Sequence, residues 1–70
     1  MQDPEVIVGA VIRKLRKKKG LTQEIFAEKA GLDRTHVYRI ESGRQSVTLR
    51  TLKIIADTLG VRVRDLVWDL

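Results

Sequence analysis

The chain has 70 residues, contains no cysteine, and carries 14 Lys and Arg against nine Asp and Glu, a formal net charge of +5. A chain this short forms one domain at most, held by helix packing without a disulfide or a thiolate metal site, and its charge favours an anionic polymer as partner. It contains neither an apolar run long enough to span a bilayer nor a basic leader followed by an apolar stretch, so we expect a cytoplasmic protein without a membrane partner.

Two helices are predicted in the N-terminal half of the chain. Asp3-Pro4 provides an N-cap and a first-turn proline for a helix that runs until Gly20. Thr22 can cap a second, short helix that Gly31 ends. Apolar residues recur at helical spacing and should face inward. They are Val8, Val11, Ile12, Leu15, Phe26, Ala27 and Ala30.

Three further helices are predicted in the C-terminal half. Asp33 caps the first of them and Gly43 closes it, while Thr48 and Gly60 bound the next. A last helical turn or two is expected at about residues 63–69. The residues expected to face inward here are Val37, Ile40, Leu49, Leu52, Ile55, Ala56, Leu59 and Leu66.

The second and third predicted helices have the spacing of a helix-turn-helix, at about residues 22–42. This unit needs a small residue on its first helix, a glycine at positive φ in the turn, and two aliphatic residues one turn apart on its second helix. Ala27, Gly31, Val37 and Ile40 meet these requirements in that order. The second helix of the unit could then enter the major groove of DNA.

Many motifs of the chain follow one family pattern. They are Gly9, Ile12-Arg13, Leu15-Arg16, Lys19-Gly20-Leu21-Thr22-Gln23-Glu24, Ala27-Glu28-Lys29-Ala30-Gly31-Leu32, Ile40-Glu41-Ser42-Gly43, Leu52, Ile55-Ala56 and Leu59-Gly60-Val61. In these motifs the sequence resembles the Cro/repressor family of helix-turn-helix proteins, also called the xenobiotic-response-element family, over about residues 9–67. The resemblance implies an all-α, compact five-helix, lambda-repressor-like DNA-binding domain formed by residues 1–70. It also implies a homodimeric transcriptional regulator.

Within that family the runs at residues 33–37 and 44–49 are similar to the controller proteins of restriction-modification systems. Phage repressors, repressor-like regulators and DNA-binding antitoxins also have short chains of this kind and stay as alternatives. Two positions depart from the family pattern. Ile25 is apolar at a place that is usually polar, which suggests a contact surface, and Arg62 replaces the Ser, Thr or Asp that often caps the last helix.

The recognition helix is expected at residues 33–42, with base contacts from its N-terminal and outward residues. Arginine can donate two hydrogen bonds to guanine, and threonine offers a hydroxyl and a methyl group. The residues assigned to base reading are Arg34, Thr35, His36 and Arg39. Phosphate contacts are expected from the start of the second helix, the recognition helix and the segment after it. The residues assigned to them are Gln23, Tyr38, Arg44, Gln45, Ser46 and Arg50.

A two-fold dimer would place two recognition helices in successive major grooves, roughly 34 Å apart, and would select an inverted-repeat operator. The expected interface is the apolar C-terminal end. It comprises Val63, Val67, Trp68 and Leu70. Trp68 fits the core equally well. Family resemblance pairs Arg16 with Glu41, and the basic cluster at residues 13–19 fits either DNA contact or cations that offset the dipole of the first helix.

Nothing in the sequence indicates an enzyme, a cofactor or a metal site. The chain has one histidine, His36, and its carboxylates are spread along helix surfaces. DNA contact and simple exposure fit His36 equally. The competing function is a module of the same fold that binds another protein, such as a toxin. Outward Arg34 and Arg39 favour the regulator, whose partners would be double-stranded DNA, a second copy of the chain and, for an activator, RNA polymerase.

Overall fold

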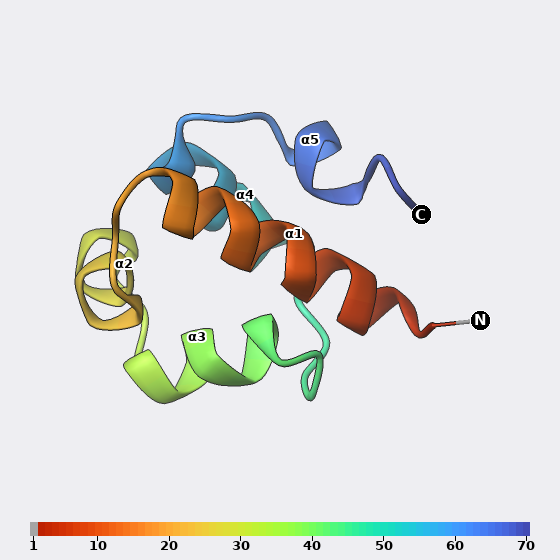
Figure 1. Cartoon of the computed structure of the whole chain (residues 1–70), viewed down its shortest axis with the longest axis horizontal. Coiled ribbons are helices and arrows are strands. Elements are labelled where there is room, and N and C mark those ends of the chain that lie inside the picture. Colours follow the sequence, from red (N-terminus) through yellow and green to blue (C-terminus); the bar gives the residue numbers. More distant parts are fainter. Residues whose placement is uncertain (1) are drawn as a thin grey trace.

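The computed structural model describes residues 2–70 and contains five α-helices over that range (Figure 1). The helices are α1 (Pro4–Lys18), α2 (Gln23–Ala30), α3 (Arg34–Glu41), α4 (Leu49–Leu59) and α5 (Val63–Val67). No strand occurs among residues 2–70. The expectation of an all-α, five-helix fold is therefore confirmed. None of the described helices combines the length and apolar character that a membrane span requires.

The middle three helices begin at the predicted caps. The side chains of Thr22, Asp33 and Thr48 each accept a hydrogen bond from a backbone N–H two or three residues further on, at 3.0–3.1 Å. These bonds satisfy donors that have no partner within the helix. Gly31 and Gly60 end α2 and α4 in the left-handed conformation, with φ of 70° and 72°. Local sequence therefore fixes both ends of α2 and α4 and the start of α3.

The outer two helices differ slightly from expectation. Asp3 is the N-cap residue of α1, but its side chain accepts no capping hydrogen bond. At its other end α1 stops at Lys18, before Gly20. Helix α5 lacks a capping side chain at Arg62, but the Arg62 N–H donates to Asp65 Oδ2 at 2.9 Å. The carboxylate three residues into the helix thus fixes the start that the sequence had left open.

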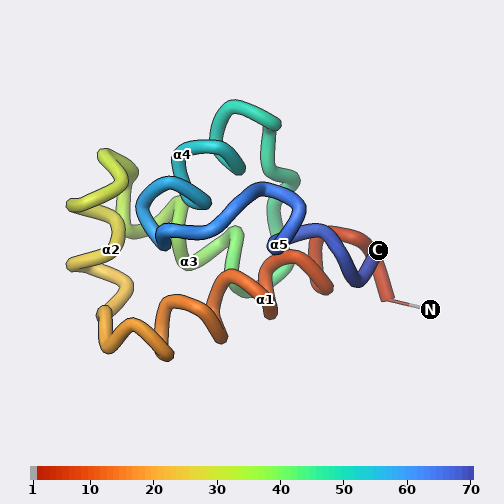
Figure 2. The backbone as a smooth tube through the Cα atoms, turned by 90° about the horizontal axis from the view of Figure 1, so that it is seen from above, coloured from red at the N-terminus to blue at the C-terminus, as the bar shows by residue number. Residues whose placement is uncertain are grey.

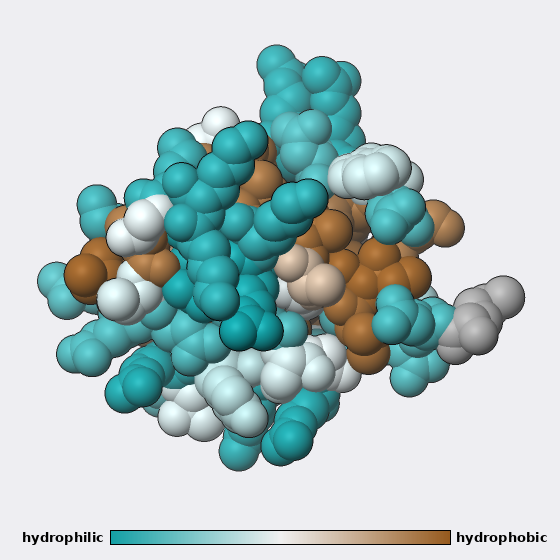
Figure 3. All heavy atoms as spheres, viewed as in Figure 1, coloured by the Kyte–Doolittle hydropathy of each residue, from teal (hydrophilic) through white to brown (hydrophobic). Residues whose placement is uncertain are grey.

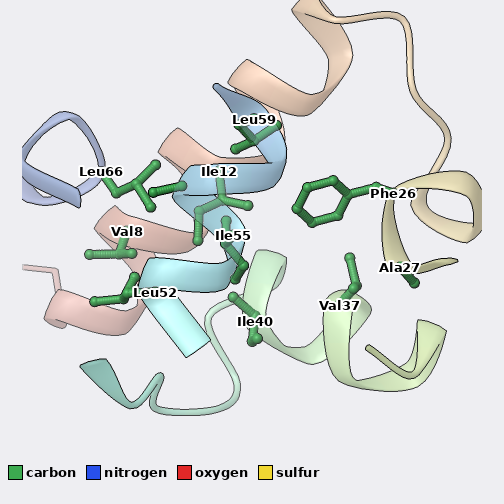
Figure 4. Close-up of a cluster of buried hydrophobic side chains, with 11 residues drawn as sticks. Val8, Ile12, Phe26, Ala27, Val37, Ile40, Leu52, Ile55, Leu59 and Leu66 are labelled. Carbon is green, nitrogen blue, oxygen red and sulfur yellow. The ribbon is translucent and has the colours of Figure 1, made fainter. Parts of the chain in front are cut away.

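All five helices contribute to one hydrophobic core (Figure 4). The Phe26 ring points from α2 into the middle of the cluster, and Leu66 closes it from α5. The buried apolar residues are Val8, Ile12, Phe26, Ala27, Val37, Ile40, Leu52, Ile55, Ala56, Leu59 and Leu66. Figure 2 shows α5 and the N-terminal half of α1 at the same end of the molecule. The end formed by α2 therefore lies far from both termini.

One inward-facing assignment is wrong. Leu49 was expected to continue the apolar stripe of α4, but it is 80% exposed. Leu49 is the first residue of the helix, and the buried stripe begins one turn later at Leu52. The helical period places Leu49 on the correct side, yet the core does not extend to that end of α4.

Helix α1 sets the position of α3 through a close backbone approach. A Cβ atom at Gly9 would overlap the carbonyl oxygen of Ile40 and would lie 2.9 Å from that of Glu41. The buried side of α3 therefore rests against α1, and the opposite side forms one edge of the molecule (Figure 1). That edge is the surface on which the predicted DNA contacts lie.

Candidate nucleic-acid interface

The outer side of α3 is polar and exposed. Val37 and Ile40 are about 1% exposed and anchor the helix, because residues three apart share one helix face. Arg34, Thr35 and Arg39 project from the exposed side. Figure 3 shows mostly hydrophilic and pale side chains along the lower edge, where Figure 1 places α3. The structure thus presents two guanidinium groups and a hydroxyl on the exposed surface of α3.

The other two α3 residues expected to contact DNA are partly covered by the protein or paired with a neighbour. His36 is half-buried, and Tyr38 is 47% exposed. Arg44 lies over the Tyr38 ring with its Cζ atom 6.0 Å from the ring centroid, the distance of a cation–π contact. The pair places a cation of the following loop beside the exposed face of α3.

The start of α2 borders this surface. Gln23, Arg34, Thr35 and Tyr38 line one shallow hollow between α2 and α3. Thr22 caps α2, so the unpaired N–H groups of its first turn lie at the same end as Gln23. A helix N-terminus of this kind attracts anions. The structure therefore brings the predicted base-reading and phosphate-binding groups of α2 and α3 together.

A second hollow, also bordered by Tyr38, is lined by residues of α1, α2 and α3. It is lined by Arg13, Arg16, Gln23, Tyr38, Glu41 and Ser42. Arg13 is exposed and adds a cation from α1 to the lining of this hollow. Sequence reasoning placed Arg13 only in a basic cluster with two interpretations. The lining of this hollow connects one member of that cluster to the surface of α2 and α3.

The other residues assigned to phosphate binding are more scattered. Gln45 is half-buried, and Arg50 is exposed in the first turn of α4. Ser46 is exposed, but its Oγ donates to Glu5 Oε1 of α1 at 3.4 Å. The neighbouring carboxylate gives Ser46 an acidic environment, whereas Arg44 and Arg50 supply positive charge.

A buried ion pair joins α1 to α3 behind this surface. Arg16 Nε donates to Glu41 Oε2 at 2.7 Å, and Arg16 Nη2 donates to Glu41 Oε1 at 3.0 Å. The two side chains are 7% and 2% exposed. Arg16 Nη1 also donates to the Leu21 carbonyl at 2.6 Å, and Gln23 Nε2 donates to Glu41 Oε1 at 3.0 Å. Sequence reasoning missed the bond from Gln23, because 18 residues separate it from Glu41 and no local motif joins them.

The C-terminal residues assigned to a dimer interface fall into two groups. Val63 and Val67 are half-buried and pack against the core, whereas Trp68 and Leu70 are 73% and 63% exposed. The alternative that Trp68 belongs to the core is therefore wrong. Figure 3 shows apolar side chains gathered toward the right-hand end, where Figure 1 places the start of α1 and the C-terminus.

No metal-binding cluster accompanies these groups in the part of the chain that the structure describes. Within residues 2–70, no three His, Asp or Glu side chains come together in a way that could hold a metal ion. The surface of α2 and α3 offers hydrogen-bond donors. These are arginine, amide and hydroxyl side chains, together with the backbone N–H groups at the N-terminus of α2. Such groups recognise phosphates and base edges.

Comparison with known proteins agrees with this chemistry. A family model described as Helix-turn-helix matches residues 12–66. The chain belongs to this helix-turn-helix family of DNA-binding transcriptional regulators, the Cro/repressor type expected from its motifs. It is similar to control protein C.MunI of a Mycoplasma species, with 39% identity over all of this chain and 96% of the relative.

Two other relatives show the range of the family. The immunity repressor protein of Bacillus phage phi105 is 42% identical over 89% of this chain and 43% of the repressor. The crystal structure of the restriction-modification controller protein C.AhdI from Aeromonas hydrophila has a TM-score of 0.86 and 39% identity, covering 89% of this chain and 94% of that one. These relatives are regulators and controllers, which confirms the expectation of a non-enzymatic protein.

Proposed function

We propose that this chain binds an inverted-repeat operator as a homodimer, with α3 of each copy in a major groove. The observation that carries the proposal is the exposure of Arg34, Thr35 and Arg39 on α3, whose inner side is anchored by buried residues. A helix held in this way can approach base edges without losing its own support. The three side chains match the donors and the methyl group that read guanine and thymine.

The backbone contacts in this proposal come from both sides of α3. Gln23 and the N-terminus of α2 meet one phosphate strand, while Arg44, beside Tyr38, and Arg50 meet DNA further along. Phosphate contacts set the register of a protein on the duplex but carry no sequence information. We assign lesser roles to Gln45, which is half-buried, and to Ser46, which lies beside Glu5.

The homodimer is proposed to form through the C-terminal end. Trp68 and Leu70 are large apolar residues left exposed, and Leu70 borders a largely apolar hollow that also includes Val67 and Val47. A second copy related by a two-fold axis would cover the same patch on each chain. Dimerisation doubles the number of DNA contacts and explains how a domain this small gains specificity.

We further propose that the chain acts as the controller of a restriction-modification system. The support is the near full-length match to C.MunI and the match to C.AhdI, a structure described as a restriction-modification controller. The phage repressor matches as well, but this chain spans less than half of it.

Selection from random duplexes tests the proposal. The chain should enrich one inverted repeat, and its affinity for that duplex should fall steeply between about 50 and 200 mM salt. Arg34→Ala tests the role of α3, because the repeat that this variant enriches should lose its preference at one base position of each half-site while binding stays salt-sensitive. A chain that bound random and enriched duplexes equally would contradict the proposal.

A further inference from the structure

The side-chain amide of Gln23 is attached to the protein interior. Gln23 begins α2, and its Nε2 donates to Glu41 Oε1 of α3 at 3.0 Å. A primary amide has two N–H donors, so this bond leaves one N–H for a partner outside the protein. Gln23 also lines both hollows that Tyr38 borders. The side chain therefore lies between the buried carboxylate and the surface assigned to DNA.

The acceptor of this bond is itself held in place. Arg16 binds both oxygens of the Glu41 carboxylate, at 2.7 and 3.0 Å, and the Glu41 side chain is 2% exposed. An ionised carboxylate only accepts hydrogen bonds. It therefore attracts the NH₂ end of the Gln23 amide and repels the oxygen end. The ion pair thus fixes which end of the amide faces inward.

We propose that Glu41 is a positioning residue for DNA binding, which orients the Gln23 amide so that its second N–H donates to a backbone phosphate. The inference rests on the proposed function, because it requires Gln23 to contact DNA. An amide that is already oriented loses less side-chain entropy on binding than a free one. The contact with Glu41 therefore strengthens the contact with phosphate.

A purely structural role for Glu41 gives a different expectation. If the ion pair only joined α1 to α3, its loss would weaken DNA binding by the same factor with or without the Gln23 amide. We therefore combine two changes. Arg16→Met with Glu41→Leu removes both charges and replaces them with apolar groups of similar size, which avoids an unpaired buried charge. Gln23→Ala removes the amide.

We compare four proteins: the wild type, Gln23→Ala, Arg16→Met/Glu41→Leu, and the protein that combines all three substitutions. Their affinity for one fixed inverted-repeat duplex is measured by fluorescence anisotropy over a range of salt concentrations. Gln23→Ala should weaken binding about tenfold in the wild-type background, as for one hydrogen bond to a charged group. In the Arg16→Met/Glu41→Leu background it should weaken binding by a clearly smaller factor, because the amide is no longer oriented there. The salt dependence should keep its slope, because Gln23 is neutral and releases no counterion.

Two results would overturn the proposal in distinguishable ways. An equal loss from Gln23→Ala in both backgrounds would show that the ion pair is only structural. No loss from Gln23→Ala in the wild-type background would remove the phosphate contact itself, and with it the positioning role, while leaving base reading by α3 intact.

A measurement on the wild-type chain needs no variant to fold. In the absence of DNA, the ¹⁵N heteronuclear NOE of the Gln23 side-chain amide should approach that of the backbone of α2. Exposed Gln2 provides the reference for an unrestrained amide. Equal mobility of the Gln23 and Gln2 amides would overturn the proposal.

Discussion

Gly9 of α1 and the carbonyl oxygen of Ile40 in α3 are so close that no side chain fits between them. The contact is made by backbone on both sides, and it sets how deeply α3 sits against α1. It occurs at the C-terminal end of α3, where Glu41 meets Arg16. A change at residue 9 should therefore move the recognition helix as well as loosen the core.

Gly9→Ala should destabilise the protein even though alanine favours helices more than glycine does. A Cβ at this position would overlap backbone, which cannot rotate away, and overpacking of this kind costs about 1–3 kcal/mol. Urea denaturation followed by circular dichroism measures the change. Ala10→Gly, at the exposed neighbouring position, should cost about 1 kcal/mol through helix propensity alone. A stabilised Gly9→Ala protein would contradict the close approach.

Removal of one member of the buried ion pair should cost more stability than replacement of both. Glu41→Ala leaves the Arg16 guanidinium buried without its counter-ion, a loss of about 3–5 kcal/mol in such pairs. Arg16→Met/Glu41→Leu removes both charges. Its urea unfolding midpoint should be well above that of Glu41→Ala. The exposed pair of Lys53 and Asp57 is the control, because neither of its single alanine variants should change the midpoint much.

Two arginines on the proposed DNA surface should have different effects when replaced. Arg34→Ala should relax preference at one base position, by about 1–3 kcal/mol of discrimination. Arg44→Ala should weaken binding to all duplexes alike and lower the salt slope by about 0.9. Anisotropy on an operator and its single-base variants measures both effects. Identical behaviour of the two variants would show that the roles are wrongly assigned.

The exposed C-terminal residues should control self-association. Trp68→Ala/Leu70→Ala removes the largest apolar groups of the proposed interface and should shift the chain toward monomer in sedimentation velocity. Operator affinity should fall with it, because a monomer contacts only one half-site. Ile25→Ala removes a 45% exposed apolar side chain from α2, the other candidate contact surface, and a shift toward monomer from this variant alone would place the interface on α2 instead. A wild-type chain that is monomeric at high micromolar concentration would contradict the interface.

The starts of α2, α3 and α4 follow from short-range signals and were therefore predictable. Thr22, Asp33 and Thr48 cap helices through bonds that span two or three residues. The exposure of Leu49 was not predictable in the same way. The helical period fixes the side on which a residue lies, whereas burial depends on whether another element reaches that end of the helix.

The sequence indicates which residues lie at the candidate site better than it indicates which of them contact one another. Thr35 and Arg39 project outward because Val37 and Ile40 must face inward, whereas Arg34 is exposed as the first residue of α3. The bond from Gln23 to Glu41 and the hollow that Arg13 and Gln23 both line involve residues of different helices. Those relationships depend on how α1, α2 and α3 pack, which no single stretch of sequence encodes.

The bonds of Arg16 limit how the recognition segment can be transplanted. One guanidinium from α1 binds the Leu21 carbonyl just before α2 and the Glu41 carboxylate at the end of α3, so both boundaries of residues 22–42 are fastened by a side chain outside them. A synthetic peptide of that segment would lack this clamp. Grafting it onto another scaffold would require an arginine placed to reach both points.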